Sequence, residues 1–337
     1  MNCIEKEIVE KAKEFLSSVE ECSLVYHGDS DGVCSAALIY KFLKNKVKMA
    51  STNDSYGIHV TEHLIERLND TKKTIIVDLA ANQWDYKKIK SGVLLIDHHS
   101  TKKDLNKEKN FIHANPRIEN PDAYIPASLL VYDLLRSIDK NMEKYAWIAG
   151  VGVIGDKGDF ERVETKEKFE DLEFISHIIE SNKGVYRKKG IEKAYEVLKD
   201  AETPKDVLDS SLIKAYHKFQ KAVNDTILDF KYHSQYFEKK NAYIYKVYNK
   251  YKLTSVVATI LSSREPDAAF FIYKRDKVLS MSGRCQSARI NLAKLMEKLT
   301  EGIGSGGGHP PAAAASIPIE NADKFMERLT DFLEGID

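Results

Sequence analysis

The chain has 337 residues, of which 43% are hydrophobic and 30% are charged, and its mean hydropathy is −0.40. This composition is typical of a folded globular protein, and the length predicts two domains. The sequence contains no run of about 18 apolar residues, which argues against a transmembrane helix and a membrane partner. Its charged, amphipathic N-terminus differs from a signal peptide, so we expect a cytoplasmic protein.

Acidic and basic residues are balanced, with 51 of each, so the net charge neither favours nor excludes a nucleic-acid partner. Any basic binding surface would have to be local. The four cysteines show no Cys-x-x-Cys spacing, which argues against a zinc knuckle and against a disulfide framework.

The first part of the chain alternates helical and apolar segments. Residues 4–19 have the pattern of an amphipathic helix, and helical periodicity returns at 32–44, 59–68 and 84–90. Between these segments lie three short apolar runs, Ser23–His27, Thr74–Asp78 and Val93–Asp97. Apolar runs that alternate with helices are typical of parallel strands covered on both faces. We therefore predict a parallel-sheet α/β domain over residues 1–185.

From residue 126 to about 228 the pattern is mostly helical, with helices predicted from Pro126 to Leu134 and from Tyr145 to Ile154. We predict that residues 186–230 form a helical connector. Beyond it, strands are predicted at 232–237, 241–247, 268–273 and 277–283, and helices at 253–263, 287–299 and 320–335. These elements predict a smaller α/β domain over residues 231–337, which contains the segment GIGSGGGHPP.

Acidic and imidazole side chains follow the predicted strands at several points. They are His27, Asp29 and Asp31 after the first strand, Asp78 at the end of the second, Asp97, His98 and His99 at the end of the third, and Asp156 after the helix that ends at Ile154. In an open α/β sheet, the ends of neighbouring strands meet at one crevice. Carboxylates and imidazoles gathered there destabilise one another unless a cation lies between them. The pattern therefore predicts a two-metal hydrolytic site, with two Mn²⁺ favoured and Mg²⁺ as the alternative.

Each ion is expected to have its own ligands. His27, Asp29 and Asp31 stand at alternate positions, so on an extended segment their side chains would face one side. We expect one ion at His27 and Asp29, a second at Asp31, His98 and Asp156, and Asp78 as the bridge. Two such ions would bind both oxygens of an in-line phosphoryl displacement and lower the pKa of a bridging water. For each aspartate alone, a helix cap or a turn is the alternative explanation.

Five motifs resemble those of a known family. The segments HGDSDGVCSA, VDLA, IDHH and IGDKGD occur in this order and resemble the four motifs of the DHH phosphoesterases, and GSGGGHPPAAAA resembles the signature of the DHH-associated C-terminal domain. The resemblance covers nearly the whole chain, and it is greatest to RecJ-like single-strand exonucleases, especially archaeal ones. Family II pyrophosphatases place a histidine four residues before the first aspartate, where this chain has Val25.

The resemblance implies roles for the residues of the metal site. By this resemblance, the metal ligands are Asp29, Asp31, Asp78, His98 and Asp156. His27 is a further expected ligand, at a position where bacterial RecJ proteins often have an aspartate. Asp97 would orient its neighbours, and His99 would contact the substrate phosphate.

Substrate contacts are expected in two other segments. The backbone of Gly306, Gly307 and Gly308 could approach a phosphate closely, His309 could donate to the same anion, and Arg284 could bind it with two hydrogen bonds. A structural turn is the alternative for the glycines. The family's small-residue run after the histidine contains a glycine, whereas this chain has only alanines at 312–315. Asn115 and Arg117 would line the substrate side of the cleft, with a solvated surface arginine as the alternative for Arg117.

The resemblance implies a RecJ-like exonuclease that releases 5′-mononucleotides from single-stranded DNA or RNA, with its site in the cleft between the domains and a role in DNA repair. One alternative is a hydrolase of short oligonucleotides, cyclic dinucleotides or 3′-phosphoadenosine 5′-phosphate, because the chain has no room for the OB-fold of bacterial RecJ. Another is a scaffold for replication proteins; such relatives lose metal ligands, whereas this chain has every one expected. Replication or repair proteins are further candidate partners.

Overall fold

The protein forms two compact units, Met1–His217 and Lys218–Asp337. The structure is a computed structural model that describes residues 4–53, 60, 62–81 and 86–336. Parts of the predicted helical segments 59–68 and 84–90 lie outside these residues. Within the described ranges, no helix is long and apolar enough to cross a membrane.

A five-stranded parallel sheet forms the centre of the first unit, in the order β2-β1-β3-β4-β5. Its strands are β1 (Cys22–Tyr26), β2 (Val47–Thr52), β3 (Lys73–Val77), β4 (Gly92–Ile96) and β5 (Phe111–Ala114). The parallel α/β prediction is therefore confirmed. The sequence did not indicate β2 because this edge strand is only partly buried and lacks a continuous apolar run.

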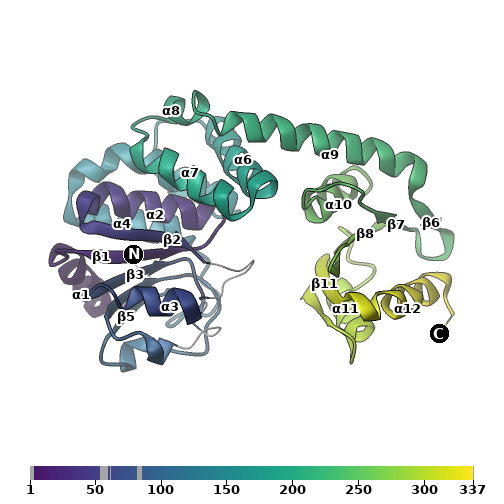
Figure 1. The fold of residues 1–337 in the computed structure, drawn as a ribbon, viewed down its shortest axis with the longest axis horizontal. Coiled ribbons are helices and arrows are strands. Elements are labelled where there is room, and N and C mark those ends of the chain that lie inside the picture. The colour runs from purple at the N-terminus through teal and green to yellow at the C-terminus, as the bar shows by residue number, and fades with distance from the viewer. Residues whose placement is uncertain (1–3, 54–59, 61, 82–85, 337) are drawn as a thin grey trace. The chain divides into compact units, whose positions relative to one another are not determined.

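Helices cover both faces of this sheet (Figure 1). They are α1 (Lys6–Ser17), α2 (Ser30–Leu43), α3 (Glu62–Leu68), α4 (Ala127–Ile138) and α5 (Ala146–Gly155). Leu24 and Ile75 pack into the core that contains α1, α2, α4 and α5, whereas their neighbours Val25 and Ile76 pack with α3. Alternate residues of each strand are thus buried on opposite faces, which explains the continuous apolar runs.

The next three helices belong to the first unit, and a fourth crosses into the second. They are α6 (Phe169–Tyr186), α7 (Lys188–Asp200) and α8 (Pro204–Leu208), followed by α9 (Ile213–His233), which contains the boundary between the units. Ile191, Tyr195 and Leu198 of α7 are buried in the same core as α2, and the Tyr195 ring stacks on Tyr26 at 5.1 Å. The first unit thus extends to His217, beyond the predicted boundary at residue 185, because the apolar face of α7 is buried in its core.

The second unit has a six-stranded sheet in the order β10-β11-β9-β8-β7-β6, in which only the β7–β8 pair is parallel. Its strands are β6 (Gln235–Phe237), β7 (Ala242–Lys246), β8 (Ala269–Arg275), β9 (Val278–Arg284), β10 (Ser305–His309) and β11 (Ala312–Pro318). Residues 232 and 233, predicted as strand, belong to α9. The strands β10 and β11 were not predicted because runs of glycine and alanine lack the residues typical of strands.

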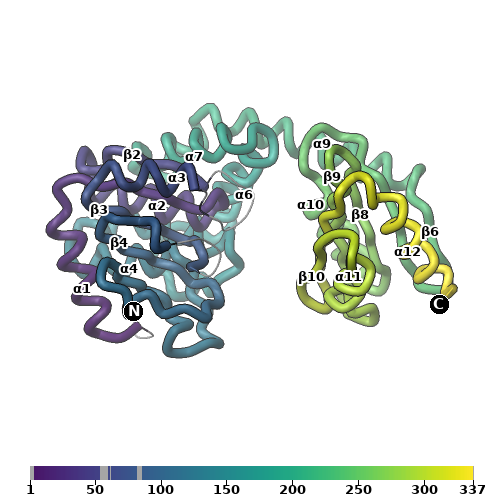
Figure 2. Tube along the Cα trace, turned by 60° about the horizontal axis from the view of Figure 1, so that its bottom comes forward, coloured from purple at the N-terminus to yellow at the C-terminus, as the bar shows by residue number. Residues whose placement is uncertain are grey.

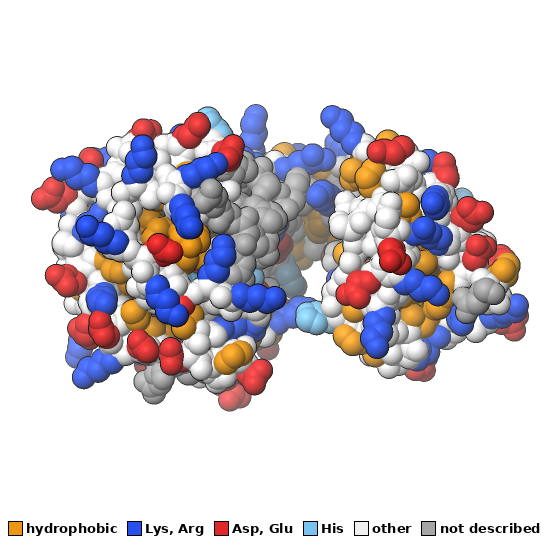
Figure 3. Space-filling model, turned by 90° about the horizontal axis from the view of Figure 1, so that it is seen from below, with side chains coloured by type: hydrophobic (Ala, Val, Ile, Leu, Met, Phe, Trp, Pro, Cys, Tyr) orange, Lys and Arg blue, Asp and Glu red, His pale blue; other side chains and the backbone are white. Residues whose placement is uncertain are grey.

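Three helices that follow β7 cover the second sheet (Figure 2), and Phe230 of α9 also packs on it, against Tyr243 and Phe270. The three helices are α10 (Thr254–Arg264), α11 (Leu292–Thr300) and α12 (Ala322–Glu334). Phe271 and Met281 point into a core with α11 and α12, and α10 packs on β8 and β9 apart from that core. Acidic and basic side chains are intermixed on the face of each unit drawn in Figure 3, as the balanced composition leads one to expect.

Candidate metal centre

The carboxyl ends of three adjacent strands bring the predicted metal ligands together in the first unit. His27 follows β1, Asp78 follows β3, and His98 follows β4. Because these strands are neighbours in the sheet, the three side chains meet above its edge. Two helix ends complete the cluster: Asp29 is the N-cap residue of α2, and Asp156 is the C-cap residue of α5.

One group of donors comprises His27, Asp29 and Asp78. The Nδ1 atom of His27 lies 2.7 Å from Oδ2 of Asp29 and 3.2 Å from Oδ2 of Asp78. These donor atoms all lie within 4.8 Å of one another, which is close enough for a single ion to bind all three.

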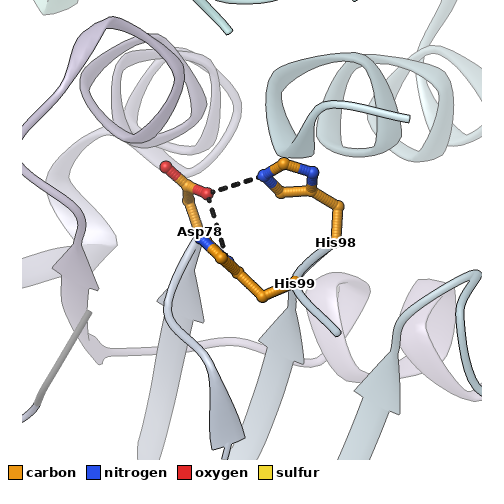
Figure 4. Close-up of side chains that lie close together, drawn as sticks. All are labelled: Asp78, His98 and His99. Atoms are coloured by element: carbon orange, nitrogen blue, oxygen red, sulfur yellow. Dashed lines mark ion pairs between the residues drawn. The ribbon is translucent and has the colours of Figure 1, made fainter. Parts of the chain in front are cut away.

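A second group comprises Asp31, His98 and Asp156. The Nε2 atom of His98 lies 3.4 Å from Oδ2 of Asp156 and 3.9 Å from Oδ2 of Asp31. The same atom is 3.2 Å from Oδ1 of Asp78 (Figure 4). One carboxylate oxygen of Asp78 therefore contacts the first group and the other oxygen contacts the second, as in a bridging ligand.

The local backbone differs from the extended segment that we expected. Asp29 caps α2 by accepting a hydrogen bond from the Gly32 amide at 3.0 Å, and Asp31 lies in the first turn of that helix. The helix, and not strand alternation, therefore directs Asp29 and Asp31 into different groups. A Cβ atom on Gly32 would lie 2.3 Å from the carbonyl oxygen of His27, so only glycine lets the helix begin this close.

Burial strongly affects the carboxylates of the centre. Burial, together with the charge of Asp78, raises the pKa of Asp31 to about 8. The pKa of Asp78 is raised well above its usual value, first by burial and then by the charge of Asp29. These buried carboxylates therefore disfavour each other's ionised form in the protein alone.

His27 supplies part of the missing positive charge. Burial opposes protonation of its imidazole, but the contacts with Asp29 and Asp78 outweigh burial and raise its pKa to about 10. Burial likewise opposes ionisation of Asp29, but the charges of His27 and then Lys183 hold the pKa of this carboxyl well below its usual range. In the protein alone, a protonated imidazole thus offsets part of the negative charge of Asp29 and Asp78.

Two observations support the fit of divalent cations to this centre. Oδ1 of Asp78 and Nδ1 of His98 are buried without a hydrogen-bond partner among the described residues. Five carboxylates gather here (Asp29, Asp31, Asp78, Asp97 and Asp156), and two divalent cations would supply four positive charges. Carboxylate oxygens mixed with imidazole nitrogens suit Mn²⁺ and, with more carboxylate than imidazole, Mg²⁺.

Asp97 and Asn115 hold His99 in place. The buried Asp97 carboxylate accepts hydrogen bonds from Nδ1 of His99 at 2.7 Å and from the Asn115 amide at 3.2 Å. Asn115 also donates to the His99 carbonyl at 3.0 Å and is only 2% exposed. The substrate contact expected of Asn115 therefore does not fit the structure, because its side chain is buried and already bonded. His99 remains partly exposed, with Nε2 as the ring nitrogen not bound to Asp97.

Tyr124 is a residue of the centre that the sequence did not reveal. Its hydroxyl donates to Oδ2 of Asp156 at 2.6 Å, and its ring meets the edge of the His98 ring with 5.4 Å between centroids. Arg117 lies beside it, with its guanidinium 5.6 Å from the ring centre and its Nε donating to the Ala123 carbonyl at 2.8 Å. Tyr124 lies in a loop between two prolines, and no sequence motif there indicates that it belongs to the metal centre.

The same segment also holds Asp31. Its two carboxylate oxygens accept hydrogen bonds from the amides of Ala127, at 2.7 Å, and Ser128, at 2.9 Å, at the start of α4. Residues 124–128 therefore contact all three members of the group that contains Asp31. Such contacts fix the orientation of metal ligands and raise their affinity for the ion.

The glycines expected to bind phosphate form a strand and not a turn. Gly306, Gly307 and Gly308 belong to β10, which pairs with β11 at one edge of the second sheet. Gly308 has a φ of +145°, and a Cβ atom there would lie 2.6 Å from the Ala312 carbonyl oxygen, so this position requires glycine. An edge strand leaves alternate backbone amides unpaired, and His309 is exposed at its end.

Arg284 ends β9 and is bonded within the second unit. It donates to Ser255 at 3.0 Å, to Thr259 at 3.3 Å and to the Gly283 carbonyl at 2.8 Å. Burial lowers its pKa, although the guanidinium stays charged. The side chain is thus held in one orientation while it remains partly exposed.

Comparisons with known proteins agree with this architecture. Residues 23–155 match the DHH family, N-terminal domain, and residues 240–335 match the DHHA1 domain. No curated protein matches the chain in sequence.

Several solved structures share the fold. RecJ in complex with Mn²⁺ from Thermus thermophilus is 14% identical with a TM-score of 0.72, over 98% of this chain and 55% of RecJ. The chain therefore spans about half the length of that protein. Exonuclease RecJ bound to manganese is 16% identical with a TM-score of 0.69, over 98% of this chain and 94% of that protein. The DHH domain of a member of a family of ribosomal proteins is 14% identical with a TM-score of 0.74, over 98% of this chain and 93% of that domain.

A pGpG-specific phosphodiesterase, PggH from Vibrio cholerae, also matches, with 16% identity, a TM-score of 0.54 and coverage of 94% of this chain and 100% of PggH. At these identities the likeness establishes the fold alone.

Proposed function

Because the chain belongs to the DHH family of phosphoesterases, we propose that it is a two-metal phosphodiesterase that degrades single-stranded nucleic acid from one end. The observation that carries this proposal is the pair of donor groups that share Asp78. A bridging carboxylate between two ion sites is suited to in-line displacement at phosphorus.

Six residues would hold the metals. They are His27, Asp29 and Asp78 for one ion and Asp31, His98, Asp156 and again Asp78 for the other. Two divalent cations bound there, Mn²⁺ or Mg²⁺, would activate a water and neutralise charge on the phosphoryl oxygens.

His99 would act on the substrate directly. Asp97 accepts the Nδ1 hydrogen bond, and Asn115 holds the His99 backbone, so the ring has a fixed direction. Burial opposes protonation of His99, but the bond to Asp97 outweighs it and raises the pKa. A protonated ring could donate from Nε2 to a phosphate oxygen and stabilise its developing charge.

The second unit would supply further phosphate contacts. Arg284 presents a guanidinium held by α10, and the unpaired amides of β10 and the exposed His309 offer donors at a sheet edge. We retain Arg117 as a candidate substrate contact and assign Asn115 to the positioning of His99. A site that uses both units would lie in a cleft between them, which stays a prediction.

Single strands of DNA or RNA are the proposed substrates because three matched structures are of RecJ and one of these is described as an exonuclease. A hydrolase of short oligonucleotides or cyclic dinucleotides is the second candidate, favoured by the match to the pGpG-specific PggH over its whole length. A scaffold without activity is the least favoured candidate because every expected metal ligand is present. The cytoplasmic location, the role in DNA repair and the replication or repair partners stay predictions.

The test is Mn²⁺-dependent digestion of end-labelled single strands of about twenty nucleotides and of dinucleotides, in DNA and in RNA. The proposal expects a ladder that descends from one end, with 5′-mononucleotides as products. Cleavage of dinucleotides alone would move the protein to the short-substrate class, and cleavage of neither would contradict both hydrolytic candidates.

A further inference from the structure

A cluster of cations lies at the junction of α6 and α7, residues 183–193, in the first unit. This α6–α7 junction contains five basic residues, Lys183, Arg187, Lys188, Lys189 and Lys193, and one acidic residue, Glu192. Lys183 pairs with Glu180 at 3.7 Å. By contrast, the side chains of Arg187 and Lys189 are exposed and make no ion pair or hydrogen bond with any residue that the structure describes.

The α6–α7 junction is packed against the start of α2, where the metal centre is built. Glu180 of α6 accepts a hydrogen bond from the Ser30 amide at 2.9 Å. Ile191 of α7 lies against Gly28, where a Cβ atom would be 2.6 Å from its Cδ1. These two contacts flank the aspartate that caps α2. The helices α6 and α7 pack against each other, and α7 also packs on α2 (Figure 1). The two helices that the junction connects therefore contact the segment that carries Asp29, within the same unit.

Arg187 also has an unfavourable backbone conformation. It ends α6 with φ of 55° and ψ of −132°, in a region that favours glycine. Its carbonyl accepts hydrogen bonds from Gly190 at 2.9 Å and from Ile191 at 3.1 Å, so the neighbouring turn holds this conformation. Helices often end with glycine at such a position, so Arg187 holds a conformation that costs backbone energy, as Lys44 does at the end of α2.

We infer that the α6–α7 junction binds the phosphate backbone of a single strand outside the scissile phosphate, with Arg187 and Lys189 as the contact residues. The inference rests on the proposed function and deepens it, because it assigns a substrate longer than a dinucleotide. Guanidinium groups bind phosphates with two hydrogen bonds. The ring of Tyr186, 41% exposed, lies next to Arg187 in sequence, and cations interleaved with aromatic rings are typical of single-strand surfaces.

The substitution Arg187→Gly separates the two roles of this residue. Glycine relieves the backbone strain, so the melting temperature should stay equal or rise by about 2 °C. Loss of the guanidinium should raise KM for a strand of about twenty nucleotides by about fivefold, while hydrolysis of a dinucleotide stays unchanged. The dependence of log(kcat/KM) on log salt concentration should become shallower by about 0.7 for one lost phosphate contact on a single strand.

Lys44→Gly is the matched control. Lys44 is exposed at the end of α2 with φ of 52° and ψ of −125°, nearly the conformation of Arg187, but at the end of the helix opposite to the metal centre. It should show the same change in stability with no change in KM or salt dependence. Arg187→Lys should keep the wild-type salt dependence because it keeps the charge.

The outcome for the inference is separable from the outcome for the proposed function. Binding of a fluorescent strand is measured with Asp78→Asn protein, which should not cut it, with and without Arg187→Gly. The inference alone would be overturned if the wild-type enzyme cuts the strand and Arg187→Gly changes neither KM, nor strand affinity, nor salt dependence. Strand binding that depends on Arg187 without any hydrolysis by wild-type protein would overturn the proposed function alone. A protein that binds no strand would overturn the inference.

Discussion

Asp78 is the residue on which the candidate metal centre most depends. It is 1% exposed, and its two oxygens contact different donor groups. We expect Asp78→Asn to lower kcat by roughly a thousandfold or more, because both ions would lose a ligand. The melting temperature of the metal-free protein should rise, since a buried carboxylate with a raised pKa is removed. Steady-state hydrolysis and thermal unfolding measure the two effects, and an active variant would rule out the bridging role.

Tyr124 is predicted to set the affinity of one metal site. Its hydroxyl donates to Asp156 at 2.6 Å, so Tyr124→Phe should weaken Mn²⁺ binding at the site of Asp31, His98 and Asp156 by about tenfold. Tyr245→Phe is a matched control, because Tyr245 makes the same 2.6 Å bond to Asp229 in the second unit. Calorimetric titration with Mn²⁺ should show one weakened site for the first variant and none for the control. Two unchanged sites in Tyr124→Phe would contradict this role.

The ionisation of the centre predicts how metal binding depends on pH. Burial and Asp78 raise the pKa of Asp31 to about 8, so near neutrality this carboxyl must lose a proton when a cation binds. His27, whose pKa is raised to about 10, must also lose its proton to bind an ion. Mn²⁺ affinity should therefore rise with pH from 6 to 8 and beyond, by up to about tenfold per pH unit for each proton released. Titration in several buffers measures the proton release. An affinity that is constant over this range would contradict the raised pKa.

The stability of the metal-free protein should show the opposite trend. A carboxyl with a raised pKa in the folded state stabilises the fold below its ordinary pKa, and this contribution is lost as the pH rises through about 8. His27, whose pKa is raised to about 10, adds a loss in the same direction from its ordinary value upward. The free energy of unfolding, measured by chemical denaturation, should therefore fall between pH 6 and pH 9, and saturating Mn²⁺ should remove much of this fall. A stability that rises over this range would be inconsistent with both shifts.

At the residue scale, the sequence indicated which side chains meet but not how they are held. Asp78 and His98 were predictable because each directly follows an apolar strand. Tyr124 and Asn115 were not, since a tyrosine or asparagine in a loop carries no periodic signal. The direction of Asp31 was misjudged because α2 begins at Ser30, two residues before the predicted helix at 32–44, so Asp31 is helical and not extended.

The glycines of the C-terminal motif form the strand β10, which the sequence pattern did not predict. We expect Gly308→Ala to lower the stability of the protein by about 1–3 kcal/mol, because its φ of +145° disfavours any other residue and the added methyl would meet Ala312. Gly307→Ala is the control, since a Cβ there has only Glu297 nearby, at 3.9 Å. Chemical denaturation distinguishes the two, and equal stability would mean that β10 does not have this conformation.

Helices and buried strands were predictable to the extent that their apolar pattern was strong. The strands β1, β3 and β4 are continuous apolar runs, and each begins and ends within one residue of its predicted range. The edge strand β2 was not predicted because it is partly exposed and has no continuous apolar run. The strands β10 and β11 were not predicted because they consist mainly of glycine and alanine, which give no such pattern. Pairing with a neighbouring strand, which sequence periodicity does not report, is what defines them.

At the scale of the whole molecule, the number of compact units was predictable and their boundary was not. Composition and the change of pattern near residue 231 indicated a second domain. The helices of 186–212 read as a connector because they are charged and amphipathic, yet Ile191, Leu198 and Leu212 are buried in the first unit. An amphipathic helix shows that it packs against something, but not against which unit.

The central claim, that two ions share Asp78, is tested most directly by anomalous diffraction at the manganese edge from crystals grown with Mn²⁺. The account predicts two anomalous peaks, one bound by His27 and Asp29, the other by Asp31, His98 and Asp156, with Asp78 contacting both. A single peak, or ions bound without Asp78, would contradict it.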